Sequence, residues 1–345
     1  MASTIRDIAN KAGVSTAAVS RVLHGSGGTI RVSEEKAAHI RAVAAQMNYV
    51  PNAVARNLKQ GKSKNVGLVF ENFGSISAGP LYYAYLFDGL AEVLFSNHYR
   101  LTILPEIDVK NAHKELSNGQ LDGLIWCKFV DDPAVEKMIG KLQLPVVALN
   151  TLESHLPPRA CAISCDNYGG ADLVVSHLVE LGHKRIAFVN EIREEQTPDA
   201  IARYEGYKAA MARHGLEVSD QDLFTWSFEA TEFPLWWETN TGHTALFVWN
   251  EGQASRILRR AQNAGVNIPG ELSVVGFDST DFCEATTPPL SAVRQPIREM
   301  ARHAATTLLS MIAGQPPEQT IVTFPVTLDV RGSTQALTQS RVSKS

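Results

Sequence analysis

The stretch TIRDIANKAGVSTAAVSRVL, residues 4–23, decides how the N-terminal part of the chain folds. Its apolar residues recur at helical spacing up to Ala12, which predicts a first helix that ends near Gly13. A glycine there can adopt the left-handed conformation that a tight turn requires. Ser15 is then a suitable N-cap for a second helix. Two short helices joined by a glycine turn form a helix-turn-helix.

A third helix is expected to follow the first two. It begins after a cap at Ser33 and turns Ile40, Val43 and Met47 toward the other helices. The three helices together predict a small all-α domain, barely large enough to fold alone.

The outer face of the second helix carries small, polar or basic side chains. Such a helix can lie in a major groove of DNA without steric conflict. Ser15, Thr16 and the helix N-terminus can meet phosphates, and Arg21 is long enough to hydrogen-bond twice to a guanine edge. The alternative is a solvated helix face with an incidental arginine. The candidate residues on this face are Ser15, Thr16, Ala17, Ser20 and Arg21.

Charge separates this head from the rest of the chain. Residues 1–64 have a formal charge of +7, whereas the remaining residues have −11, so the overall charge of −4 hides the difference. A basic head on an acidic body indicates a polyanionic partner for the head alone. A merely solvated basic surface is the alternative, and the charge by itself does not decide between them.

The composition of the 345 residues is that of an ordinary globular protein, with 44% hydrophobic and 20% charged residues. This length suggests two or three domains. We find neither a signal peptide nor a membrane-spanning stretch, which predicts a cytoplasmic protein without a membrane partner. The four cysteines form no paired framework and no zinc pattern, so we expect reduced thiols, no metal and no cofactor.

The run from Thr4 to Gly25, followed by VSEEKAAHIRAVAAQMNYVPNAVARNLKQGKS, resembles the DNA-binding head of the lactose/galactose-repressor family of bacterial transcription factors. The resemblance implies a sequence-specific regulator, in the first place a repressor. It also implies a homodimer on a near-palindromic operator in double-stranded DNA. Thr4, at the start of the motif, joins the candidate DNA-binding residues.

The segment that begins at Pro51 is expected to be a hinge. Proline suits the first turn of a helix, but so short a helix is not stable alone in water. Paired with its copy on DNA, it would place Asn52, Ala55 and Lys59 toward the minor groove. Leu58 would then be a wedge between base pairs. A flexible tether is the alternative.

Beyond the hinge, segments of strand and helix character alternate. NVGLVF at 65–70 reads as a strand, the segment at 80–98 as a helix, and 109–119 as a further helix; the alternation restarts after ACAISCDN. This order predicts parallel sheets wrapped by helices. Two series of alternating strands and helices suggest two lobes with a cleft between them. Such sheets bind ligands beyond the carboxyl ends of their strands. The expected domains are the head at 1–50, the hinge at 51–64, the two-lobed domain at 65–333 and a polar tail at 334–345.

The segments DGLI, DNYGG, RYEGY and LSVVGFD resemble the regulatory domain of the same family, which is similar to periplasmic sugar-binding proteins. The resemblance implies a small effector in the cleft: a sugar, a sugar acid or, as a further option, a nucleobase. An arginine suits hydroxyls or a carboxylate, and an aspartate accepts hydrogen bonds from sugar hydroxyls. The implied effector-binding residues are Tyr82, Tyr83, Arg203, Phe228, Trp249, Asn250 and Asp278.

Other roles for these residues stay open. Asp278 could cap a local turn, Tyr83 or Phe228 could belong to the core, and Arg203 could form a structural ion pair with Glu205 or another acid. A solute-binding protein without DNA function would need a signal peptide and would not need the basic head. We find no phosphate-binding loop, nucleophile elbow or His-Glu-x-x-His motif, so we expect no enzyme and no catalytic residues.

Overall fold

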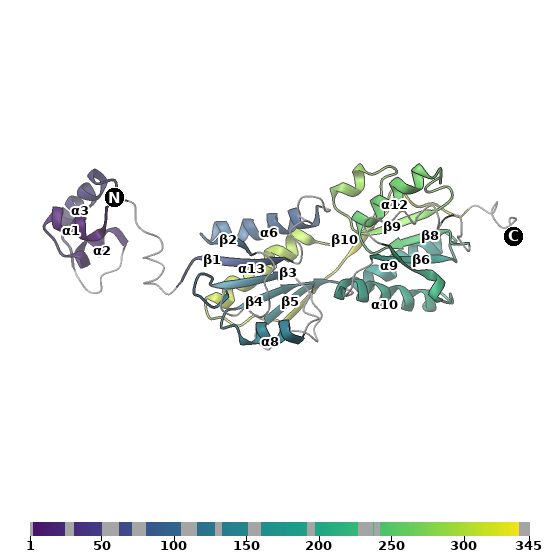
Figure 1. Ribbon diagram of the computed structural model, residues 1–345, viewed down its shortest axis with the longest axis horizontal. Helices are drawn as coiled ribbons and strands as arrows, with labels where there is room; N and C mark the ends of the chain where they lie inside the picture. Colours follow the sequence, from purple (N-terminus) through teal and green to yellow (C-terminus); the bar gives the residue numbers. More distant parts are fainter. Residues whose placement is uncertain are drawn as a thin grey trace. The chain divides into compact units, whose positions relative to one another are not determined.

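The structure is a computed structural model (Figure 1) that describes residues 3–24, 31–49, 62–70, 81–104, 116–127, 133–150, 160–191, 197–226, 237 and 242–337. The chain forms two compact units, Met1–Lys64 and Asn65–Ser345, which we call the head and the body. Several predictions lie outside the described residues. They concern Asn52, Ala55, Leu58, Lys59 and Phe228, together with most of the helix expected at 109–119.

The head consists of three helices, as predicted: α1 (Ile5–Ala12), α2 (Thr16–His24) and α3 (Glu34–Gln46). Gly13 ends α1 with a φ of 64°, the left-handed conformation that the turn into α2 requires. Ile8, Val19 and Ile40 are fully buried, one from each helix. Three short helices therefore share one small apolar core, which fixes the direction in which the outer face of α2 points.

The first lobe of the body is a six-stranded sheet in the order β11-β5-β4-β3-β1-β2, and all of its neighbouring strands are parallel. Its strands are β1 (Asn65–Phe70), β2 (Arg100–Leu104), β3 (Gly123–Cys127), β4 (Val146–Leu149), β5 (Ala160–Cys165) and β11 (Ile321–Phe324). Its helices are α6 (Tyr82–Ser96), α8 (Pro133–Lys141) and α13 (Ile297–Ile312). The helix α8 had no counterpart in the sequence analysis.

The second lobe has a six-stranded sheet in the order β12-β10-β9-β8-β6-β7. Its strands are β6 (Ile186–Glu191), β7 (Leu223–Trp226), β8 (Ala245–Val248), β9 (Ser273–Asp278), β10 (Ser291–Arg294) and β12 (Thr327–Asp329). The helices are α9 (Asn167–Glu180), α10 (Pro198–Arg213) and α12 (Glu251–Asn263), with short 3-10 turns η2 (Asp220–Asp222) and η3 (Asp281–Ala285). The prediction of parallel sheets holds except at one edge, where β12 runs antiparallel to β10.

The chain passes between the lobes three times, which the sequence analysis did not foresee. It crosses after β5, again after β10, and a third time between β11 and β12 (Figure 1). The two series of alternating strands and helices therefore do not correspond one to one to the two lobes, because α13 and β11 return to the first lobe. Their place follows from packing, because Leu308 of α13 lies over Gly123 of β3, and α13 also packs along α6.

Two further findings concern the chemistry of the chain as a whole. All four cysteines are free thiols, as predicted. Within the described ranges, no helix is both long and apolar enough to cross a bilayer.

Candidate functional site

Arg203 is the centre of a buried polar cluster in the second lobe. Helix α10 carries it, and its side chain is 3% exposed. Its Nε donates to Asn167 Oδ1 at 2.8 Å, and its Nη1 donates to the backbone oxygen of Trp249. Its Nη2 lies 3.4 Å from Asp199 Oδ2 and 3.6 Å from Asp278 Oδ1. The cluster thus joins the start of α9, the first turns of α10 and the ends of β8 and β9.

The ion pairs settle which acids face this arginine. Glu205, the partner considered from the sequence, lies 2.7 Å from Lys208 instead. Asp199 lies one helical turn before Arg203, so the two share a face of α10. The ring of Phe277 covers one face of the guanidinium at 3.7 Å. Arg203 is therefore a structural ion-pair partner as well as a group at the strand ends.

Asp278 ends β9 in an unusual backbone conformation. Its φ is 94° and that of Ser279 is 42°, so two consecutive residues with side chains lie at positive φ. Such conformations cost on the order of 1–3 kcal/mol each and persist where the surroundings impose them. The Oδ1 atom accepts a hydrogen bond of 2.6 Å from Gln295 Nε2. Burial raises the pKa of Asp278 to about 7, and Arg203 opposes that shift only in part.

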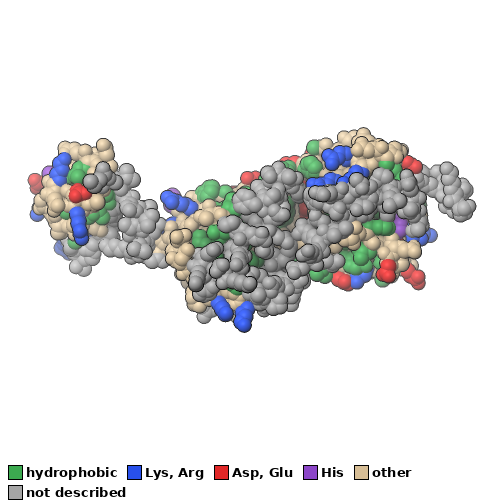
Figure 2. Space-filling view, viewed as in Figure 1, with side chains coloured by type: hydrophobic (Ala, Val, Ile, Leu, Met, Phe, Trp, Pro, Cys, Tyr) green, Lys and Arg blue, Asp and Glu red, His purple; other side chains and the backbone are tan. Residues whose placement is uncertain are grey.

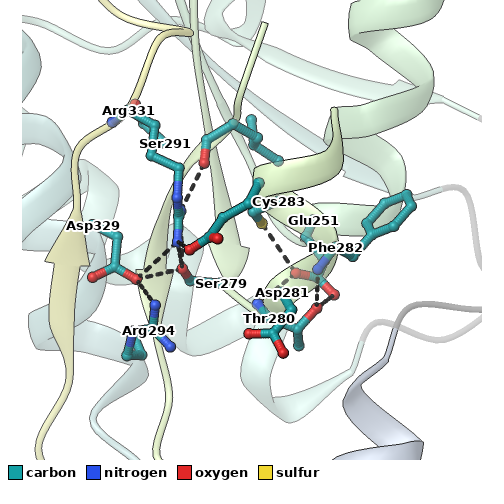
Figure 3. A network of polar contacts seen from close by, with 12 residues as sticks. Glu251, Ser279, Thr280, Asp281, Phe282, Cys283, Ser291, Arg294, Asp329 and Arg331 are labelled. Atoms are coloured by element: carbon teal, nitrogen blue, oxygen red, sulfur yellow. Dashed lines mark hydrogen bonds and ion pairs between the residues drawn. The ribbon is translucent and has the colours of Figure 1, made fainter. Parts of the chain in front are cut away.

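A fully buried carboxylate anchors the turn that follows Asp278 (Figure 3). Glu251, the first residue of α12, accepts hydrogen bonds from the Thr280 backbone at 2.8 Å and the Thr280 hydroxyl at 2.6 Å. The Cys283 thiol also donates to Glu251, at 3.1 Å. These bonds hold η3 against the N-terminus of α12.

A second anchor holds the same turn to strand β12. The Ser279 hydroxyl donates to Asp329 Oδ2 at 2.6 Å, and Arg331 donates to Ser279 Oγ at 3.1 Å. Arg294 forms an ion pair of 2.6 Å with Asp329. Figure 3 shows these side chains converging on Ser279 from the two neighbouring strands. Hydrogen bonds on both sides of the turn thus hold the backbone of Asp278 in its positive-φ conformation.

The first lobe contributes neutral groups to the same region. Tyr82, at the start of α6, accepts a hydrogen bond from Asn150 Nδ2. The rings of Tyr82 and Tyr83 meet edge to face at 5.4 Å. Burial raises the pKa of Tyr82 well above its usual range, and the charge of Asp278 adds to that shift. The charge of Asp278 in the second lobe therefore acts on the phenol of Tyr82 in the first lobe.

Two predicted effector-binding residues have structural roles. The Asn250 side chain caps α12, because its Oδ1 accepts from the backbone N–H of Gln253 at 2.7 Å. Trp249 is buried in the core, and its backbone oxygen receives Arg203. The structure thus brings together Arg203, Asp278 and Tyr82 of the predicted set, with Trp249 and Asn250 close by as supports.

The sequence analysis missed several members of the cluster. Asp199 could have been found from its spacing of four residues from Arg203 on a helix. Asn167 and Gln295 could not, because each lies at a crossing between the lobes whose position depends on the whole fold. The described residues contain no group of three or more His, Cys, Asp or Glu that could hold a metal ion.

In the head, the outer face of α2 is accessible. Ser15, Thr16 and Arg21 are exposed, whereas Ala17 and Ser20 are half-buried. Ser15 Oγ accepts from the Ala18 backbone at 3.2 Å, so it is the predicted cap. Lys and Arg side chains are visible on the head in Figure 2.

Thr4 has a different role from its neighbours in the motif. Its hydroxyl donates to Asp7 Oδ2 at 2.7 Å and accepts from the Asp7 backbone, which forms the capping box of α1. The hydroxyl is therefore engaged in the helix cap.

Known proteins match both units. Residues 4–52 match the model of bacterial regulatory proteins of the lacI family, and residues 175–334 match a periplasmic binding protein-like domain. Catabolite control protein A of Priestia megaterium is 30% identical over 96% of this chain and 99% of its own. The chain belongs to the LacI family of bacterial regulatory proteins. Like the other members of the LacI family, it is a DNA-binding transcriptional regulator and not an enzyme.

Solved structures of LacI-family proteins share the fold. The lac repressor dimer bound to operator and the anti-inducer ONPF matches with a TM-score of 0.82 and 22% identity, over 97% of this chain and all of that chain. A complex of the regulator CelR with cellobiose matches with a TM-score of 0.70 and 24% identity, over 96% of this chain and 99% of that one.

Proposed function

We propose that this LacI-family protein represses transcription as a homodimer that binds a near-palindromic operator in the bacterial cytoplasm, on the nucleoid. The observation that carries the proposal is the exposed N-terminal face of α2 on a three-helix head of basic charge. Arg21 would read a guanine, and Ser15 and Thr16 would contact phosphates. Asn52, Ala55 and Lys59 would contact the minor groove and Leu58 would kink the duplex.

A small effector bound between the lobes would control the repressor. Support comes from the cluster around Arg203 and Asp278 at the strand ends, and from the cellobiose held by the structural relative CelR. Tyr82, Tyr83 and Phe228 would line the same cleft. The effector would shift the equilibrium between arrangements of the lobes, and a coupling free energy of about 1–3 kcal/mol to operator binding is typical of such regulators.

Operator binding tests the first part of the proposal. Operators are selected from random duplexes with the full chain, and affinity is measured by fluorescence anisotropy at several salt concentrations. We expect affinity to fall steeply with salt. Arg21→Ala should cost about 1–3 kcal/mol on the selected operator and less on random DNA.

Arg41→Ala on α3 is the matched control, because Arg41 is exposed and pairs with Glu34 at 3.0 Å. Equal losses from Arg21→Ala on operator and random DNA would contradict the base-reading role of Arg21. If no duplex binds but a sugar does, the alternative of a solute-binding protein without DNA function is correct.

A thermal-shift screen of the full chain tests the effector. A compound that binds the folded state raises the melting temperature by mass action. The compounds that raise it are then added to the operator titration. A compound that binds but leaves operator affinity unchanged would contradict control by an effector.

A further inference from the structure

Given the proposed function, on which this inference rests, we infer that the effector is an uncharged or cationic hydrogen-bond donor and that the site rejects sugar acids and other anions. Neutral sugars, nucleosides and amino sugars belong to the accepted class. The inference narrows the expectation from the sequence, which left a sugar and a sugar acid equally open.

Arg203 has little capacity left for a ligand carboxylate. An arginine binds a carboxylate strongly through two parallel N–H donors on one edge of its guanidinium. Here Nε donates to Asn167, Nη1 to Trp249, and Nη2 faces both Asp199 and Asp278. An incoming carboxylate would have to displace one of these partners from a side chain that is almost fully buried.

Negative charge exceeds positive charge around Arg203. The two carboxylates of Asp199 and Asp278 face a single guanidinium, and the fully buried Glu251 adds to the negative potential at Asp278. Arg294 and Arg331 do not correct this balance, because two acids, Asp329 and Glu284, pair with them. A further anion would therefore enter a region of low dielectric that already has surplus negative charge.

The site offers hydrogen-bond acceptors to a ligand. Asp278 presents carboxylate oxygens, which in the ionised form can accept hydrogen bonds but cannot donate them. Within the described part of the chain, the buried Oε1 of Gln295 has no hydrogen-bond partner, while its Nε2 is held by Asp278. A buried acceptor without a partner is unfavourable, and a hydroxyl or N–H group of a ligand would satisfy it. The acceptors of Asp278 and Gln295 lie next to each other, as two neighbouring donors on one ligand would require.

The ionisation of Asp278 gives the inference a pH dependence. The groups that face this carboxylate are Arg203, Gln295, Asp199, Glu251 and, from the other lobe, Tyr82. Burial raises the pKa of Asp278 to about 7, and a neutral donor ligand favours the ionised form. The affinity for such a ligand should therefore rise from pH 6 to pH 8, because Asp278 is already ionised in a larger fraction of the protein molecules.

The test compares compounds that differ only in charge. The full chain is titrated with D-glucose, D-glucosamine and D-glucuronate, with the corresponding galactose set, and with D-ribose, cellobiose, adenosine and D-gluconate. Binding is read from the melting temperature and, for compounds that shift it, by calorimetry at pH 6 and pH 8. We expect binding to be confined to neutral and cationic compounds, with the matching uronate at least about tenfold weaker.

Asp199→Asn then tests the cause of the selectivity. This change removes one negative charge and one partner of Arg203, so the ratio of neutral to uronate affinity should fall at least about threefold. Glu205→Gln on the same helix is the control, because Glu205 pairs with Lys208 on the surface. The ratio should not change in the control.

A uronate or gluconate that binds as well as its neutral counterpart would overturn the inference. So would the absence of any shift from the neutral and cationic compounds, or an unchanged ratio in Asp199→Asn. Operator binding is measured on the same samples. Loss of operator binding with charge-selective ligand binding intact would contradict the proposed function and leave this inference standing.

Discussion

The two lobes of the body are built alike and yet differ in chemistry. Each has a six-stranded sheet and one close helix crossing at a glycine. In the first lobe Gly89 of α6 meets α13, and in the second Gly206 of α10 meets α9. In the described part of the chain, however, the buried charges at strand ends lie in the second lobe, at Arg203, Asp278 and Glu251. The first lobe faces them with phenol and amide groups.

Packing and ligand chemistry therefore place separate demands on the same architecture. Parallel sheets of similar design bring strand ends together in both lobes. Among the described residues, only the second lobe uses its strand ends for an ion cluster, with the positive φ at Asp278 and two anchors on the following turn. The second lobe should therefore be sensitive to loss of charge, whereas both lobes should be equally sensitive to loss of close packing.

The largest effect is expected from Arg203→Ala. This change leaves Asp199 and Asp278 buried without their cation, and breaking a buried ion pair from one side typically costs about 3–5 kcal/mol. Urea denaturation should show that loss in the free energy of unfolding. Calorimetry with the compounds found in the thermal-shift screen should show that binding is abolished.

Arg213→Ala is the control, since Arg213 pairs with Asp172 on the surface and its side chain is 55% exposed. Its effect should stay below about 1 kcal/mol. Equal losses in the two variants would mean that the cluster of the second lobe has no special role.

The second effect concerns pH. The folded-state pKa of Asp278 is raised from 3.8 to about 7, so the folded state binds this proton more tightly than the unfolded state. The stability that results is complete below about pH 4 and is lost as the pH rises through 7. Between pH 5 and pH 8 the wild type should lose roughly 2–3 kcal/mol relative to Asp278→Asn.

Urea denaturation of both proteins at pH 5, 6, 7 and 8 checks the difference. Asp88→Asn in the first lobe is the control, because Asp88 is exposed and pairs only at the surface with Arg298. If the free energy of unfolding depends on pH in the same way in the wild type and in Asp278→Asn, the carboxyl at this position does not have a pKa near 7.

The third effect, loss of close helix packing, should be similar in the two lobes. A Cβ atom at Gly206 would lie 2.5 Å from the backbone oxygen of Tyr168, and one at Gly89 would lie 2.5 Å from that of Arg298. Gly206→Ala and Gly89→Ala must each push two helices apart, which should cost about 1–3 kcal/mol. Unfolding of the two variants in urea measures both costs. A loss in only one variant would show that the two crossings are not mechanically equivalent.

The sequence predicts what local chemistry determines. Gly13 and Ser33 mark helix ends through their own backbone and side-chain preferences, and the structure confirms both. The apolar strands at the lobe centres and the pairing of Arg203 with an acid could likewise be anticipated. The features that could not be predicted are non-local. The sequence of α13 alone does not determine which sheet its apolar face covers.

The same distinction applies to the candidate site. Asn250 is polar and stands at a strand end, which fits a ligand contact, but the cap of α12 uses its oxygen. Glu251, the next residue in the chain, anchors η3 with its carboxylate. Gln295 and Asp329 gave no signal, because they reach the site only where the chain passes between lobes.

The smallest effect is expected from Tyr85→Phe, which probes a contact between the lobes. Tyr85 of α6 accepts a hydrogen bond of 3.3 Å from the Asp281 backbone in η3, and its ring lies 3.6 Å from the Arg298 guanidinium. Phenylalanine keeps the ring and its cation–π contact but loses the acceptor. Because the bond is long and exposed, the free energy of unfolding should fall by less than about 1 kcal/mol.

The informative readout is the response to effector. The turn that donates this bond begins at Asp278, so the bond links the ion cluster of the second lobe to a helix of the first. Tyr85→Phe should change operator affinity little without effector and alter the effector-induced change by about two- to fourfold. Tyr168→Phe, at an exposed tyrosine of α9, is the matched control. If both variants respond as the wild type does, the lobes communicate through their crossing strands and not through η3.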